Sequence, residues 1–283
     1  VNWMTMAKRI CALTMVRNDE FFLRKWVAYY KEQLGASNLY VYFDGKDQVV
    51  PDFCSDINVC VKERVQGQVA AADRGRIDFL SSQAAELLKT YDMVIGTDVD
   101  EFLVVDPLLD VSLSEFLSAL PERTSYSGLG IDVGQHLELE GEIDASGPFL
   151  EQRHYAQLST RYSKSTVITE PVAWGSGFHR VRNSNFHIVK DLYLFHFGCV
   201  DMKRLEAKFS DKDKIATGWE RHLKKRAKTI YNVTQGKIRP WNSWVPKARA
   251  IQNVVRPPYA WNKPAMFSMK IIVEIPERFR KLI

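Results

Sequence analysis

The sequence predicts an α/β fold in which a mixed sheet is flanked by helices. Short apolar runs rich in β-branched residues alternate with segments of helical spacing over the first hundred residues. The chain has 283 residues, of which 46% are hydrophobic, as in an ordinary globular protein. Polar clusters follow directly after several of the apolar runs. Since ligands of open α/β sheets bind outside the carboxyl ends of strands, this pattern also predicts where a site would lie.

The elements follow one another in a βαβ order. Residues 10–16 are an apolar strand, and a polar turn leads from it into a helix over 21–34 that stops at Gly35. Because a helix separates the first two strands, a parallel, right-handed connection is expected. The further strands expected in the sheet cover 38–43, 59–65, 93–95, 126–133 and 192–198. The further helices expected cover 69–88, 112–121, 201–209 and 218–231.

An acidic motif follows the strand at 93–95. Asp98, Asp100 and Glu101 place three carboxylates within four residues, and such a group repels itself unless a cation or hydrogen-bond donors compensate. Hard oxygen ligands suit Mg²⁺, Mn²⁺ or Ca²⁺. In an extended segment, Asp98 and Asp100 would share one face while Val99 packs behind them. An EF-hand loop is excluded because Leu103 stands where that loop needs glycine. The alternative is an acidic loop that only contacts solvent or caps a helix.

Polar residues after the first two strands would gather at the same edge as Asp98. Arg17, Asn18 and Glu20 follow the first strand, and Asp44 follows the second. The chain contains neither a G-x-G-x-x-G sequence nor a P-loop, which argues against both of those nucleotide-binding types. The remaining possibility is a nucleotide that binds through carboxylates and a metal ion.

Three motifs together resemble a known enzyme family. They are Thr-Met-Val-Arg-Asn-Asp-Glu at 14–20, Tyr-Val-Tyr-Phe-Asp at 40–44 and Thr-Asp-Val-Asp-Glu-Phe at 97–102. This combination resembles the family 2-like glycosyltransferases, especially the branch related to family 92, over residues 10–105. The resemblance implies a GT-A fold with a Rossmann-type mixed sheet. It also implies transfer of a sugar from a nucleoside diphosphate sugar, usually of uridine or guanosine, with Mn²⁺ or Mg²⁺ as cofactor.

The same resemblance assigns roles to residues. Arg17 and Asp19 stand where the family commonly has lysine and glutamate, which leaves the identity of the base open. The residues predicted to bind the donor are Val16, Arg17, Asn18, Glu20, Asp44, Arg76, Asp98, Lys164 and Lys208. The residues predicted to hold the metal are Asp98, Asp100 and His196. A histidine in an apolar strand is also typical of a packed core, and that alternative stays open for His196.

The base that would take the proton of an acceptor hydroxyl is not determined by any motif. The candidates are Asp132, His179 and Glu170, with Glu151 as a fourth, and a retaining reaction is equally compatible with the sequence. The expected acceptor is a glycan or another hydroxyl compound, such as a precursor of a cell-envelope polysaccharide or lipopolysaccharide.

The charge is concentrated towards the carboxyl terminus. The formal net charge is +5, and residues 203–256 hold fifteen Lys and Arg against four Asp and Glu. We expect a catalytic domain over 1–210 and a basic, helical and extended region over 211–283 packed on it. The proline-flanked Trp241 and Trp244 favour packing anchors over a sugar platform. Peripheral membrane contact through Lys224, Lys225 and Arg226 is an option, and no nucleic-acid partner is expected.

Several classes are disfavoured by what the sequence lacks. No run of 18 apolar residues or signal-peptide pattern is present, so a cytoplasmic protein is expected, although an anchor upstream of Val1 stays open. The four cysteines lack the spacing of zinc sites or of a disulfide framework. A nucleotidyltransferase is an alternative function, but it should show a glycine-rich first loop, which residues 16–20 are not. A non-catalytic nucleotide- or carbohydrate-binding protein is the other alternative.

Overall fold

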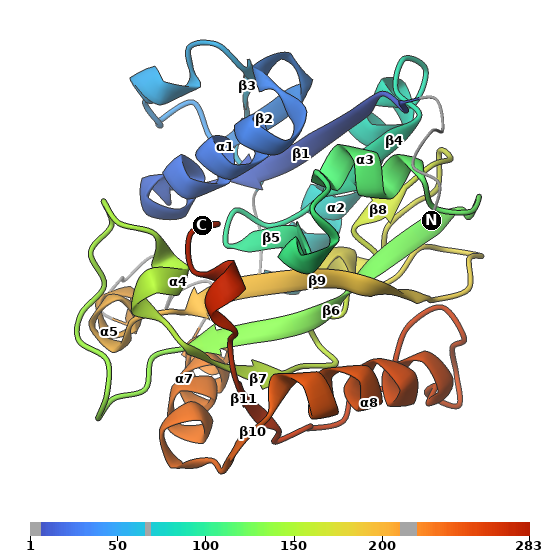
Figure 1. Cartoon of the computed structure of the whole chain (residues 1–283). Helices are drawn as coiled ribbons and strands as arrows, with labels where there is room; N and C mark the ends of the chain where they lie inside the picture. Colours follow the sequence, from blue (N-terminus) through green and yellow to red (C-terminus); the bar gives the residue numbers. More distant parts are fainter. Residues whose placement is uncertain (1–6, 66–68, 210–219) are drawn as a thin grey trace.

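The computed structural model describes residues 7–65, 69–209 and 220–283, with the side chains of 69, 70, 208, 209 and 220–226 left undescribed. It contains a large mixed sheet flanked by helices, as Figure 1 shows. The strands are β1 (Ile10–Val16), β2 (Leu39–Asp44), β3 (Asn58–Lys62), β4 (Met93–Gly96), β5 (Glu101–Val105), β6 (Ser125–Gly134), β7 (Tyr155–Leu158), β8 (Val167–Ile168), β9 (Ile188–Cys199), β10 (Ile238–Arg239) and β11 (Ile272–Glu274). The α-helices are α1 (Glu20–Leu34), α2 (Val69–Leu87), α3 (Leu113–Ser118), α4 (Phe149–Gln152), α5 (Met202–Phe209), α7 (Glu220–Gln235) and α8 (Trp241–Val254).

The sheet has a parallel half and an antiparallel half. Its strand order is β10-β11-β7-β6-β8-β4-β1-β2-β3, with β9 paired to both β5 and β6. Strands β3, β2, β1 and β4 are mutually parallel, so β1, β2 and β4 end at the same edge. Strand β9 runs parallel to β6 and antiparallel to β5. The carboxyl ends of β6 and β9 therefore meet the amino end of β5, directly after the acidic motif.

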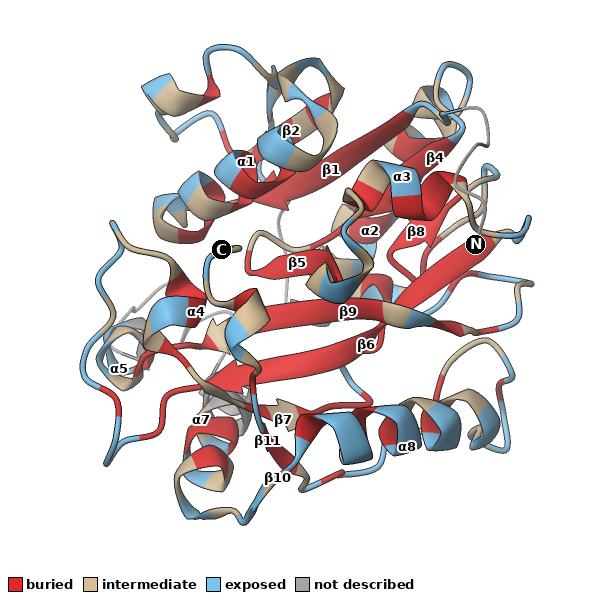
Figure 2. Cartoon of the chain, in the orientation of Figure 1, coloured by how far each residue is buried: buried red, intermediate tan, exposed pale blue. Residues whose placement is uncertain are grey.

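The alternation of side chains along β1 explains how the sheet is covered. Cys11, Leu13 and Met15 belong to a core with α2, whereas Ile10 and Ala12 belong to a core with α1. Helix α1 therefore covers one face of the parallel half and α2 covers the other (Figure 1). Figure 2 shows β1, β4, β5, β6 and β9 as almost entirely buried. Burial on both faces accounts for the nearly continuous apolar runs of β1 and β4.

The carboxyl-terminal region contains a helix that was not expected at its position. Residues 241–254 form α8 despite Pro246 in its second turn, because Trp241, Val245 and Ala248 bury one side of the helix. Trp241 is 5% exposed and packs edge-on against Tyr193, so its role as a packing anchor is confirmed. Strands β10 and β11 join the antiparallel half through β7. Within the described ranges no helix is both long and apolar enough to cross a bilayer. The predicted membrane contacts at 224–226 lie outside the described side chains.

Candidate active site

The acidic motif forms a tight turn between β4 and β5. The amide of Glu101 donates to the carbonyl of Asp98 over 3.0 Å, which reverses the chain after Val99. The expectation that Asp98 and Asp100 share one face of an extended segment is therefore wrong. Because the chain turns, the two carboxylates point to different partners, and Glu101 begins a new strand. Strand β5 was not expected from the sequence.

Asp98 belongs to a cluster of charges. Arg76 donates to its Oδ1 over 2.7 Å and Lys164 to its Oδ2 over 3.1 Å. Burial alone would raise the pKa of Asp98, but the charges of Arg76 and Lys164 more than offset it and hold that pKa well below its usual range. Asp98 is thus an anion engaged by two cations. The structure therefore brings together Arg76, Asp98 and Lys164, three of the residues that the sequence analysis expects to bind the donor.

A second group of side chains has the chemistry of a metal site. Asp100, Glu101 and His196 each offer a ligand atom, and these atoms lie within 4.8 Å of one another. All three residues are buried, and Nε2 of His196 has no hydrogen-bond partner although Oδ2 of Asp100 lies 3.5 Å away. A buried nitrogen without a hydrogen-bond partner beside two carboxylates fits a divalent cation such as Mn²⁺ or Mg²⁺, which would displace the proton on that nitrogen. The sequence predicted Asp98 as a metal ligand together with Asp100 and His196. In the structure, Glu101 and not Asp98 lies with these two residues.

His196 is oriented by residues from three parts of the chain. Its Nδ1 lies 2.7 Å from Oδ1 of Asp132 on β6, and Oδ2 of Asp132 accepts a hydrogen bond from Thr229 on α7. The ring of Tyr162 stacks on the imidazole with centroids 3.6 Å apart. A carboxylate behind the second ring nitrogen is the usual support of a metal-binding histidine. Burial would lower the pKa of His196, but Asp100 and Asp132 raise it to about 9.

Glu101, one of the three possible metal ligands, forms a buried ion pair with Lys164. Nζ of Lys164 lies 2.5 Å from Oε1 of Glu101, and these residues are 3% and 1% exposed. Burial raises the pKa of Glu101 to about 7, against the opposing charge of Lys164. Lys164 stays charged, since Glu101 and Asp98 outweigh the effect of burial and raise its pKa. The site therefore carries a buried cation next to the acidic group.

The turns after β1 and β2 are held together by one arginine. Nη1 of Arg17 donates to the carbonyl of Asp44 over 2.7 Å, and the guanidinium also pairs with Asp47. Gly45 has φ +125°, and a Cβ built there would lie 2.4 Å from Nη1 of Arg17. Only glycine fits this position without displacing the arginine. The two turns therefore form one unit at the edge where Asp98 lies.

His179 lies close to the charged cluster. Phe178 packs against Gly96, where a Cβ would meet its ring at 2.7 Å, and this places the glycine-rich turn of residues 175–180 beside the end of β4. The Nδ1 atom of His179 is buried and has no hydrogen-bond partner. Burial and the nearby charge of Lys164 lower the pKa of His179 to about 3, so the imidazole is neutral at physiological pH. A neutral imidazole can accept a proton.

Some predicted residues are not brought to this group. Glu170 follows β8, which runs antiparallel to β4, so Glu170 is exposed near the opposite end of the sheet, where Thr124 donates to it. Asp132 is 4% exposed with both oxygens engaged, which fits positioning of His196 and not removal of an acceptor proton. Glu20 pairs with Arg24 on the exposed side of α1. The Lys208 side chain lies outside the described part of the chain.

Other predicted residues line the shared edge of the sheet. Val16 is buried at the end of β1, where its backbone continues into the turn. Asn18 has φ 49°, a left-handed conformation that asparagine tolerates, and its amide donates to Gln48 over 2.7 Å. Asp44 accepts a hydrogen bond from the amide of Val65 over 2.7 Å. These contacts fix the turn where a nucleoside is expected.

Aromatic residues of α1 form buried hydrogen bonds to the segment that contains the acidic turn, and the sequence did not reveal these contacts. Nε1 of Trp26 donates to Oγ1 of Thr97 over 2.9 Å. The hydroxyl of Tyr29 donates to the carbonyl of Leu103, and the hydroxyl of Tyr30 accepts from the amide of the same residue. These buried hydrogen bonds fix both ends of the segment that carries Asp98, Asp100 and Glu101. The helical spacing of these aromatic residues indicated only a core face.

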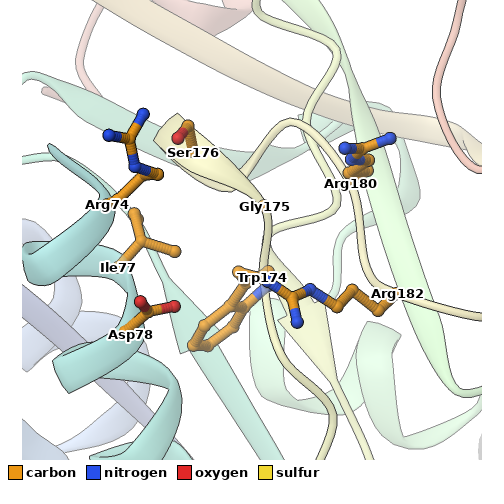
Figure 3. Close-up of a pocket in the computed structure, with 8 residues that line it drawn as sticks. All are labelled: Arg74, Ile77, Asp78, Trp174, Gly175, Ser176, Arg180 and Arg182. Atoms are coloured by element: carbon orange, nitrogen blue, oxygen red, sulfur yellow. The ribbon is translucent and has the colours of Figure 1, made fainter. Parts of the chain in front are cut away.

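A separate pocket of about 160 Å³ lies on the outer side of the glycine-rich turn (Figure 3). Helix α2 contributes one wall and the segment after β8 the other. It is lined by Arg74, Ile77, Asp78, Trp174, Gly175, Ser176, Arg180 and Arg182. The three guanidinium groups and one carboxylate give the pocket a net positive charge. The ring of Trp174 also packs on Gly96, so it separates this pocket from the acidic turn.

No protein-family model matches the sequence, and no curated protein matches it either.

Proposed function

We propose that this protein is a metal-dependent glycosyltransferase of the GT-A type that transfers a sugar from a nucleoside diphosphate sugar to a hydroxyl acceptor. The observation that carries the proposal is the buried group of Asp100, Glu101 and His196 at the carboxyl edge of the parallel strands. The adjoining turns after β1 and β2 supply a fixed surface for a nucleoside. The resemblance of residues 10–105 to the family 2-like enzymes supports the same assignment.

The charges around Asp98 suit a diphosphate leaving group. A divalent cation, when bound, would neutralise negative charge that develops on the departing diphosphate. Lys164 adds a fixed positive charge beside it, and its pairing with Asp98 and Glu101 holds the ammonium in place. Arg76 adds a second cation from α2, which pairs with Asp73 and Asp98. Because the cations are already ordered, little reorganisation is needed when charge develops.

His179 is the best placed candidate for the acceptor side. Its imidazole is neutral and has an unpaired Nδ1 close to Lys164 and Asp98. A low pKa makes it a weak base, so its role is to accept a hydrogen bond from the acceptor hydroxyl and orient it. The proposal therefore assigns His179 to positioning and leaves the stereochemical outcome open.

A donor panel tests the proposed function. Thermal shift and donor hydrolysis would be measured with UDP- and GDP-sugars, with and without Mn²⁺, for the wild type, Asp100→Ala and the exposed control Asp110→Ala. We expect a metal-dependent shift and slow hydrolysis in the wild type and the control, and neither in Asp100→Ala. Binding without hydrolysis or transfer would instead indicate a non-catalytic nucleotide-binding protein. The proposal fails if no nucleotide sugar shifts the melting temperature in the presence of metal.

A further inference from the structure

A long connection joins α8 to β11 (Figure 1). It exposes an unusual number of apolar side chains. Tyr259 and Trp261 are 74% and 76% exposed, and both are large rings with a polar edge. The exposed large apolar side chains of the segment are Val254, Val255, Tyr259, Trp261, Met266 and Phe267. Apolar groups gathered on a surface in this way mark binding sites. We call residues 254–267 the aromatic segment.

Hydrogen bonds connect the two ends of the aromatic segment and attach it to neighbouring parts of the chain. The amide of Ala265 donates to the carbonyl of Val255 over 3.2 Å, which brings the two ends of the segment together. Asn262 donates to the carbonyl of Val181, and Thr160 donates to the carbonyl of Phe267, each over 3.0 Å. The exposed rings therefore belong to a segment whose backbone is fixed by hydrogen bonds at several points. A ligand would not have to order the segment before stacking on it.

The two anchoring points connect the aromatic segment to the candidate active site. Thr160 precedes Lys164, which pairs with Asp98, by four residues, a span of at most about 15 Å. Val181 follows His179 by two residues, a span of at most about 8 Å. One supporting segment thus carries Lys164 of the charged cluster, and the other carries His179, which lies beside that cluster. Lys263 of the aromatic segment also acts electrostatically on His179, which indicates that the segment lies near the site.

The charge around the aromatic segment is positive. Residues 250–273 include Arg256, Lys263 and Lys270 but no Asp or Glu. Nζ of Lys263 lies 5.0 Å from the centre of the Tyr259 ring, so one of these charges sits beside an exposed aromatic face. Arg161, in the anchoring segment, is exposed as well. The surface therefore combines aromatic faces with cations.

We propose that the aromatic segment binds the acceptor, and that the acceptor is a carbohydrate chain carrying acidic groups. The inference rests on the proposed function, since it assigns the acceptor side of the same site. Pyranose rings present apolar C–H faces that stack on Tyr and Trp, while the polar edges of those side chains hydrogen-bond to sugar hydroxyls. Carboxylate or sulfate groups on the chain would meet Lys263 and Arg161. The position beside the donor site favours this occupant over a membrane surface.

Binding measurements without nucleotide or metal test the proposal. Titration calorimetry would use hexagalacturonate, a chondroitin sulfate hexasaccharide and neutral maltohexaose. We expect at least one acidic oligosaccharide to bind more tightly than maltohexaose and to weaken with rising salt. The double variant Tyr259→Ala, Trp261→Ala should lose at least tenfold in affinity. The matched control Leu108→Ala removes a side chain that is 75% exposed elsewhere and should bind like the wild type.

Three outcomes would overturn the inference. One is that no acidic oligosaccharide binds, and another is that the double variant, shown to be folded by its melting temperature, binds like the wild type. The third is that the protein binds vesicles of phosphatidylcholine and phosphatidylglycerol through Tyr259 and Trp261 and binds none of the sugars. Failure of the donor panel with intact sugar binding would remove only the proposed transferase activity. Donor hydrolysis without sugar binding would remove only the acceptor assignment.

Discussion

His196 and Asp132 face each other from neighbouring strands, with Nδ1 of the imidazole 2.7 Å from Oδ1 of the carboxylate. This contact leaves Nε2 directed at Asp100 and Glu101. We expect Asp132→Asn to weaken Mn²⁺ binding about 10- to 100-fold, because the substitution removes the charge that orients and supports the ligand. Titration calorimetry with MnCl₂ measures the effect, with Asp110→Asn as an exposed control. Equal affinity in Asp132→Asn and the wild type would rule out this supporting role.

Metal affinity should depend on pH through His196. Its pKa is raised to about 9, so at neutral pH the imidazole is protonated and a cation must displace that proton. Affinity for Mn²⁺ should therefore rise with pH, by roughly tenfold per unit between pH 7 and 9, and level off above. Calorimetry in buffers of different ionisation enthalpy would detect the released proton. A flat profile over this range would contradict His196 as a ligand.

The metal-free protein should lose stability as pH rises through the titration of Glu101. The pKa of this buried carboxyl is raised from 4.5 to about 7, so the folded state binds more protons than the unfolded state between these values. Its contribution is fully present below pH 4.5 and declines by about 3 kcal/mol at most towards pH 7. Urea unfolding in the presence of a chelator measures the slope. Glu101→Gln should reduce the slope of unfolding free energy with pH. An unchanged slope would mean that other groups cause the pH dependence.

Gly45→Ala should disrupt the joined turns after β1 and β2. The residue has φ +125°, and its new Cβ would lie 2.4 Å from Nη1 of Arg17. We expect a loss of about 1 to 3 kcal/mol in the free energy of unfolding and weaker nucleotide binding. Gly141→Ala is the matched control, since nothing lies within 4 Å of a Cβ built there. Similar urea midpoints for the two variants would show that this glycine is not required.

Tyr29→Phe should destabilise the strand that follows the acidic turn. The substitution removes the donor to the buried carbonyl of Leu103, and an unsatisfied buried acceptor costs about 1 to 3 kcal/mol. Tyr231→Phe serves as the control because Tyr231 is 50% exposed. Denaturant unfolding of both variants measures the difference. A change below 0.5 kcal/mol in Tyr29→Phe would mean that water or another donor replaces the hydroxyl.

The sequence predicted the parallel half of the fold because each strand there is a short apolar run with a clear stop. Gly35 ends α1 with φ 85°, and the capping box at Ser112 and Glu115 begins α3 as expected. Strand β5 was missed because its first residue completes an acidic cluster that is typical of a loop. Helix α8 was missed because Pro246 favours an extended chain, whereas burial of Trp241 and Val245 outweighs that preference.

Only those parts of the candidate site that depend on local sequence patterns could be predicted. Carboxylates after an apolar run identified the acidic motif, and His196 was recognised at the end of its strand. The role of Glu101 depends on the turn at Val99, which a period-two argument does not foresee. The contact between Asp132 and Thr229 joins residues 97 positions apart, and a local sequence pattern cannot predict a contact at that separation. The aromatic segment escaped notice because exposure is a property of the folded chain.

The hydrogen bond from Thr229 to Asp132 has a consequence for biosynthesis. The acidic turn leaves the ribosome about 130 residues before the helix that completes its support. At 5 to 20 residues per second, this gap corresponds to roughly 6 to 26 s of translation. During that interval the nascent chain carries the carboxylates of the proposed metal site, while Asp132 lacks the hydrogen bond from Thr229 that supports its contact with His196. Full assembly of the site is therefore a late event that follows synthesis of α7.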